Sequence, residues 1–120
     1  MTLDALRALA ASVGFPNPAL AAAVAMAESG GDPNAVGDDG TSLGLWQIHL
    51  PAHPEFASEN LFDPVTNARA ALAISHGGAT WQPWSTFNSG AYLRWYLGAG
   101  AIALLLVVSG LAIAGHWRGR

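Results

Sequence analysis

The stretch that decides the fold reads ESGG at residues 28–31 and, after a loop, GLWQI at residues 44–48. Residues 19–27, just before it, are mostly alanine, the strongest helix former. The paired glycines supply the left-handed conformations that end a helix, so Glu28 is expected in the last helical turn. The sequence therefore predicts a single carboxyl group at the end of an apolar helix, beside a glycine-rich loop.

The surroundings expected for Glu28 suit a general acid. Burial removes solvation from a carboxylate, and the negative end of a helix dipole also disfavours it, so both effects raise the pKa. A carboxyl group that keeps its proton near neutral pH can donate that proton to a leaving group. By position alone Glu28 is better explained as a solvated residue at a helix end, and only the neighbouring motif reverses this interpretation.

Two more helices are indicated by their end signals. Thr2 is a suitable N-cap for an amphipathic helix over residues 3–13, whose composition is a poor match to a secretory signal. The pair Asp-Pro at residues 63–64 begins a helix that continues to Ile74 and ends at the glycines of residues 77–78. With the helix that carries Glu28, these predict a mainly α domain.

The C-terminal segment, residues 97–115, contains no charged side chain. As a helix with a rise of about 1.5 Å per residue it is about 28 Å long, close to the roughly 30 Å hydrocarbon thickness of a bilayer. Aromatic residues at positions 95, 96 and 117 lie where the membrane interfaces are expected. A core helix is the alternative, but a small domain has little protein to surround it. We expect a soluble domain at 1–96, a transmembrane helix at 97–115 and a basic tail at 116–120.

Composition excludes several kinds of partner. The chain is 52% hydrophobic and 11% charged with a net charge of −3, and residues 1–96 carry eight acids against three arginines. This balance argues against a nucleic-acid partner, which needs a basic surface. His49 and His53 have the spacing of metal ligands on a helix, but Pro51 and Pro54 disfavour a helix there. We therefore expect no metal site and no cofactor.

Further segments extend the two motifs into a pattern. Turn-forming clusters occupy residues 32–44, and residues 81–92 read WQPWSTFNSGAY. Over residues 19–92 the chain resembles lytic transglycosylases and goose-type lysozymes, with a closing segment similar to that of phage virion-associated transglycosylases. The resemblance implies a small, mainly α, lysozyme-like helical domain with a glycan cleft, here followed by the C-terminal transmembrane helix.

The resemblance also implies a reaction. The substrate would be bacterial peptidoglycan, cleaved at the β-1,4 bond between N-acetylmuramic acid and N-acetylglucosamine. Glu28 would protonate the leaving oxygen and then accept the proton of the sugar's C6 hydroxyl, which closes to a 1,6-anhydro end. Residues matched to the family's substrate-binding positions are Ser29, Ser42, Trp46, Gln47, Phe87 and Tyr92. Trp46 is equally well explained as a core residue.

Two departures leave alternatives open. Phe87 stands where many relatives carry tyrosine, so a hydroxyl that orients the acid must come from elsewhere, for example from Tyr92. Asp38 and Asp39 are either a solvated loop or the source of a second carboxylate, which would allow the two-carboxylate hydrolysis of ordinary glycosidases.

The alternatives to a transglycosylase are a hydrolytic lysozyme for host lysis or envelope remodelling and a noncatalytic glycan-binding structural protein. An intact Glu28 favours an enzyme. Delivery in a phage particle, with virion partners, would bring the domain to the wall without a signal peptide. We therefore expect a single-pass membrane protein of a virion membrane or of the host envelope.

Overall fold

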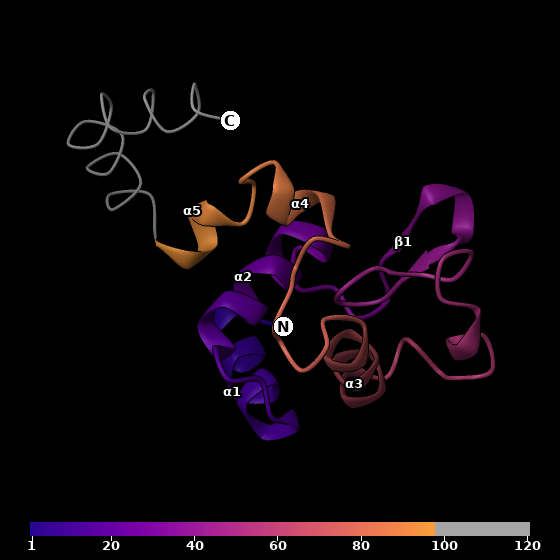
Figure 1. Cartoon of the computed structure of the whole chain (residues 1–120), viewed down its shortest axis with the longest axis horizontal. Coiled ribbons are helices and arrows are strands. Elements are labelled where there is room, and N and C mark those ends of the chain that lie inside the picture. Colours follow the sequence, from indigo (N-terminus) through magenta and orange to yellow (C-terminus); the bar gives the residue numbers. More distant parts are fainter. Residues whose placement is uncertain (98–120) are drawn as a thin grey trace.

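Helix α2 (Pro18–Ser29) is the central element of the fold (Figure 1). The computed structural model describes residues 1–97. Helix α1 (Leu3–Val13) packs along α2 and also contacts α3 (Pro64–Ile74), while the short helices α4 (Ser85–Asn88) and α5 (Leu93–Tyr96) contact α2. The prediction of a small, mainly helical domain is confirmed by this arrangement.

The three long helices lie where the sequence predicts them, although α3 ends at Ile74, before the glycines of residues 77–78. Side-chain oxygens of Thr2, Asn17 and Asp63 accept hydrogen bonds from backbone N–H groups in the first turns of α1, α2 and α3. These bonds satisfy donors that a helix leaves unpaired. Gly30, with a φ of 64°, ends α2 in the left-handed conformation and donates its N–H to the Met26 carbonyl. The end of α2 is thus fixed directly after Glu28.

The region between α2 and α3 contains a small sheet that the loop prediction did not include. Its strands are β1 (Val36–Gly37), β2 (Ser42–Leu43) and β3 (Ile48–His49), paired antiparallel in the order β1-β2-β3. Ser42 pairs with Gly37 on one side and with His49 on the other. Two-residue strands are too short to show an alternating pattern in sequence, so the turn residues dominated the prediction. Two 3-10 turns, η1 (Asp38–Gly40) and η2 (Pro54–Phe56), complete this region.

The core lies between α2 and a group of aromatic rings. All five residues from Ala21 to Ala25 in α2 are fully buried. Phe15 stacks against Trp46 and Trp81, with ring centroids 6.0 and 5.4 Å apart. The Trp46 indole donates a 3.0 Å hydrogen bond to the Ala21 carbonyl. This bond connects the GLWQI motif to α2, the helix that carries Glu28. Small residues on α2 let these large rings approach its backbone closely.

The predicted transmembrane helix at 97–115 lies, except for Leu97, outside the described residues. Within residues 1–97, none of the helices is long and apolar enough to cross a bilayer. The last described helix, α5, ends at Tyr96. The division at residues 96 and 97 and the basic tail at 116–120 therefore stay predictions.

Candidate active site

A cleft of about 330 Å³ lies between the end of α2, the small sheet and the start of α4. This volume is within the range of about 300–1,000 Å³ typical of small-molecule sites. Three regions of sequence that are far apart supply its walls. The lining residues are Glu28, Asp38, Ser42, Gln47, Ile48, His49, Ala52, His53, Ile74, Pro83, Trp84 and Ser85.

Glu28 supplies the partly buried carboxyl group of this cleft. The hydroxyl of Thr86, on α4, donates a 2.5 Å hydrogen bond to Glu28 Oε2. Burial raises the pKa of Glu28 above its ordinary value, and the hydroxyl and backbone N–H of Thr86 oppose the rise because they favour the charged form. The negative charge of Asp38 adds a smaller rise to the same pKa. Glu28 thus keeps its proton to higher pH than an exposed glutamate.

Thr86 is a functional candidate that the sequence argument missed. The sequence predicts that a hydroxyl group next to Glu28 comes from a residue such as Tyr92, because Phe87 stands where the resemblance implies a tyrosine. In the structure Tyr92 stacks on Phe87, with ring centroids 4.9 Å apart, and burial raises the pKa of its phenol. Thr86 lies next to Phe87 in the first turn of α4, and no feature of the sequence links this position to Glu28. The contact between them exists only in the folded domain.

Gln47 enters the cleft from an unusual backbone conformation. Its φ is 47°, and its side-chain Nε2 donates hydrogen bonds of 3.1 and 3.0 Å to the carbonyls of Ala35 and Gly44. Gly37 leaves room for this side chain, because a Cβ atom there would lie too close to Gln47 Oε1 and would push the amide out of its place. A residue held in the left-handed region persists only when its surroundings fix it, which is common at binding sites.

The loop that carries Gln47 is held from below by Asn67, a fully buried residue of α3. Its Oδ1 accepts a 2.9 Å hydrogen bond from the Trp46 N–H, and its Nδ2 donates 2.9 Å bonds to the carbonyls of Leu43 and Leu61. A Cβ atom at Gly44 would collide with this amide. The glycine of the GLWQI motif therefore allows the loop to lie directly on Asn67.

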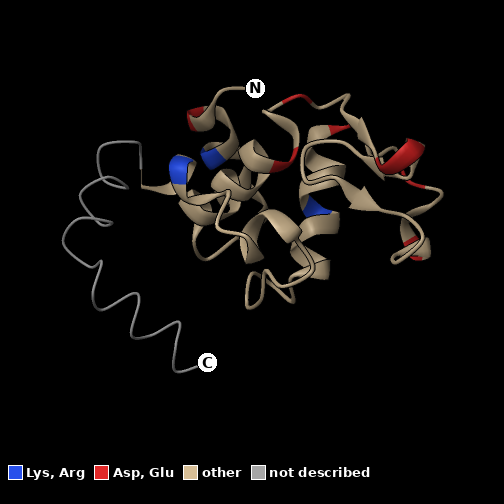
Figure 2. Cartoon of the chain, turned by 90° about the horizontal axis from the view of Figure 1, so that it is seen from above, with Lys and Arg blue, Asp and Glu red and all other residues tan. Residues whose placement is uncertain are grey.

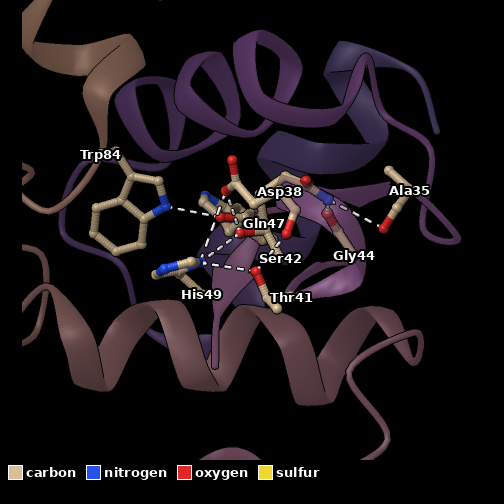
Figure 3. Close-up of polar contacts among 9 residues, drawn as sticks. Ala35, Asp38, Thr41, Ser42, Gly44, Gln47, His49 and Trp84 are labelled. Atoms are coloured by element: carbon tan, nitrogen blue, oxygen red, sulfur yellow. Dashed lines mark hydrogen bonds and ion pairs between the residues drawn. The ribbon is translucent and has the colours of Figure 1, made fainter. Parts of the chain in front are cut away.

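The lining of the cleft also contains a connected polar cluster of Asp38, Ser42 and His49 (Figure 3). The buried Ser42 hydroxyl donates a 2.6 Å hydrogen bond to Asp38 Oδ2 and lies 3.0 Å from His49 Nδ1. The same ring nitrogen lies 3.7 Å from Asp38 Oδ2. Asp38 has a φ of 51°, so its carboxylate is presented by a strained turn.

The sequence of residues 7–86 matches the family of the lysozyme-like domain. The match covers two thirds of the chain, and it includes Glu28, the small sheet and Thr86. The chain belongs to this family. No curated protein and no solved structure matches the chain. Membership of the lysozyme-like family fits an enzyme that cleaves peptidoglycan.

The lysozyme-like domain brings some of the predicted site residues together and separates others. Glu28, Ser42 and Gln47 line one cleft. Trp46 is fully buried in the core, where its backbone carbonyl accepts a 2.8 Å hydrogen bond from the indole of Trp84. Its ring thus supports the cleft from behind, and Trp84 is the tryptophan that lines the cleft.

Ser29, Phe87 and Tyr92 lie outside the residues that line the cleft. The Ser29 hydroxyl donates a 3.0 Å hydrogen bond to the Ala25 carbonyl and accepts one from the Gly31 N–H, so it holds the end of α2. Phe87 and Tyr92 form a stacked pair, and Phe87 directly follows Thr86, the residue that donates to Glu28.

The charge of this lysozyme-like domain is unevenly distributed. Residues 32–63 carry six acidic side chains and no lysine or arginine. Figure 2 shows acidic residues gathered at the end of the molecule that holds the strands and their loops. No group of three or more potential metal ligands occurs within residues 1–97. Of these six acids, only Asp38 lines the cleft, so the acidic surface lies mainly outside it.

Proposed function

We propose that this lysozyme-like domain cleaves the glycan chain of peptidoglycan with Glu28 as the general acid. The observation that carries the proposal is the partly buried Glu28 carboxyl group, which has a raised pKa and a 2.5 Å contact with Thr86 in a cleft. A carboxyl group with these properties holds a proton in a fixed direction, and general acid catalysis of glycosidic cleavage needs this.

We further propose that the bond is cleaved by transglycosylation. The Glu28 proton passes to the leaving O4 as the C1–O4 bond of N-acetylmuramic acid breaks. The sugar's C6 oxygen then bonds to C1 and gives its proton to a base in the cleft, which leaves a 1,6-anhydro end. The resemblance of the ESGG and GLWQI motifs supports this course, and so does the presence of a single partly buried carboxyl group at the cleft.

Glycan contacts are proposed for residues inside and outside the cleft. Gln47 and Ser42 line the cleft, and Trp84 offers an aromatic wall, although its N–H is already bonded to the Trp46 carbonyl. Outside the lining of the cleft, Phe87 and Tyr92 present a stacked aromatic pair on which a sugar ring could lie. Ser29 is proposed to act indirectly, because it holds the end of the helix that carries Glu28.

A membrane anchor and delivery in a phage particle complete the proposal. The anchor rests on the uncharged segment at residues 97–115, and the delivery rests on the resemblance of residues 81–92 to virion-associated enzymes. With this anchor, the domain would act on wall close to a virion membrane or the host envelope.

The deciding experiment compares the full-length protein with its Glu28→Gln variant on purified peptidoglycan. The amide keeps the shape of the side chain but has no proton of comparable acidity, so we expect turnover to fall by about 10²- to 10⁴-fold. Glu59→Gln, an exposed position outside the cleft, is the matched control and should cleave like the unchanged protein.

Mass spectrometry of the digest then distinguishes the reaction. Anhydro ends support transglycosylation. Reducing ends would instead mean hydrolysis. This is the second candidate function, because Asp38 lines the same cleft and provides a second carboxyl group. Absence of cleavage by the unchanged protein, with glycan binding retained, would mean a noncatalytic binding protein.

A further inference from the structure

The cluster of Asp38, Ser42 and His49 does more than provide a polar wall. Cleavage with a hydroxyl nucleophile needs a group that accepts the hydroxyl's proton as well as an acid that protonates the leaving oxygen. The family resemblance assigns both tasks to Glu28 in turn. The hydrogen bonds of this cluster identify a second group that is free for the accepting task.

Two hydroxyl groups, those of Ser42 and Thr41, lie beside His49 Nδ1. The Ser42 hydroxyl donates to Asp38 Oδ2 at 2.6 Å. The Thr41 hydroxyl donates to the Asp38 backbone carbonyl, also at 2.6 Å. A hydroxyl has only one proton to donate, so both oxygens are left as acceptors toward any further neighbour.

That neighbour is His49 Nδ1, which lies 3.0 Å from Ser42 Oγ and 3.5 Å from Thr41 Oγ1. The third polar atom near it, Asp38 Oδ2 at 3.7 Å, belongs to a carboxylate that only accepts when ionised. Because every polar neighbour is an acceptor, Nδ1 must carry the proton. The bond made by one ring nitrogen sets the state of the other, so the Nε2 of a neutral His49 has a free lone pair.

The position of His49 makes this lone pair available to a substrate. The side chain is 44% exposed and lines the same cleft as Glu28. Figure 3 shows the second ring nitrogen on the side away from Asp38 and Ser42. The other titratable groups lining the cleft are Glu28, Asp38 and His53. Of these, only Asp38 is in the hydrogen-bonded cluster with His49.

We propose that His49 is the general base of the reaction, with Asp38 and Ser42 as the positioning residues that fix its tautomer. The step rests on the proposed function. Glu28 gives its proton to the leaving O4 as the C1–O4 bond breaks. The C6 oxygen bonds to C1, and its proton passes to His49 Nε2. Solvent then removes the proton from His49 and returns one to Glu28, so the site needs no further reactant.

The first test measures the tautomer of His49 by nitrogen NMR on the full-length protein with labelled histidine. We expect the neutral ring to carry its proton on Nδ1. This experiment needs no substrate and no substitution, and a neutral ring with its proton on Nε2 overturns the proposal.

The second test compares His49→Ala with His76→Asn, a matched control at an exposed left-handed position outside the cleft, where asparagine is tolerated. We expect peptidoglycan turnover to fall about 10²-fold or more in His49→Ala. The limb on the acid side of the pH–rate profile should disappear, and added imidazole should restore part of the rate. His76→Asn should keep the rate and the profile. Ser42→Ala is a second variant that keeps the imidazole, and it should lower the rate less than His49→Ala does.

The outcomes separate this proposal from the proposed function. Full activity in folded His49→Ala, with Glu28→Gln inactive, leaves Glu28 as the acid and refutes the base. A large loss without imidazole rescue and with an unchanged pH profile also refutes it, because a merely structural role gives that pattern. If the unchanged protein does not cleave peptidoglycan, both proposals fail together.

Discussion

Asn67→Leu should strongly destabilise this domain. Leucine has the same branched arrangement of four heavy side-chain atoms as asparagine, but its two larger methyl groups cannot form hydrogen bonds. The change removes three bonds of 2.9 Å and leaves the Trp46 N–H and the carbonyls of Leu43 and Leu61 without their partner. Because Asn67 is fully buried, water cannot replace it without opening the structure.

The magnitude follows from these three groups. Each buried group left unpaired costs about 1–3 kcal/mol, and the added apolar burial of leucine returns about 1.5–3 kcal/mol. We expect the free energy of unfolding to fall by about 4 kcal/mol, a large part of the roughly 5–15 kcal/mol of a typical domain. At about 4–8 °C per kcal/mol, Tm should fall by about 15 °C or more.

The assay is denaturant unfolding of the purified protein, followed by the fluorescence of the buried tryptophans. Asn88→Leu is the matched control, since this exposed residue makes a single bond of 2.8 Å to the Gln82 carbonyl. It should cost about 1 kcal/mol or less. An Asn67→Leu variant as stable as this control would refute the idea that Asn67 holds the GLWQI loop on α3.

Three other predictions address the site and the anchor. In Thr86→Val, the pKa of Glu28 should rise further, because the hydroxyl that favours the charged carboxylate is lost. The limb on the basic side of the pH–rate profile should therefore move to higher pH, and an unchanged limb would contradict this. Gly37→Ala should displace the Gln47 side chain and lower peptidoglycan turnover about 10-fold or more while the protein stays folded, as circular dichroism can check. A chain ending at Tyr96 should stay in the aqueous fraction with full turnover, whereas the full chain should partition into detergent; the reverse behaviour would make residues 97–115 part of the core.

The helices could be predicted from sequence because their signals are local. Asn17 with Pro18, and Asp63 with Pro64, mark helix starts through bonds made within one turn, and the structure has both helices. The small sheet was not predictable in this way. Its strands depend on the pairing of Ser42 with His49, and nothing within two residues of either position encodes that partner.

The same distinction applies to the site. Glu28, Ser42 and Gln47 were identified because they lie in motifs of short range, and they do line one cleft. Thr86 was missed because it lies 58 residues from Glu28 in the chain, and its contact exists only after α4 packs on α2. His49 was weighed only as a metal ligand with His53, since the donors and acceptors around its ring become visible only in three dimensions.

Alanine-rich α2 also has a consequence for how such an enzyme can diversify. With only methyl groups at most positions from Ala21 to Ala25, the surrounding elements lie at distances set by the helix backbone itself. A larger side chain there would cost about 1–3 kcal/mol and would shift the carboxyl group at the end of the same rigid helix. The opposite wall is made of turns and two-residue strands, which accept insertions and new side chains more easily. If Glu28 is the acid as proposed, new glycan preferences should arise in residues 36–53, while the helix that carries Glu28 keeps its small residues.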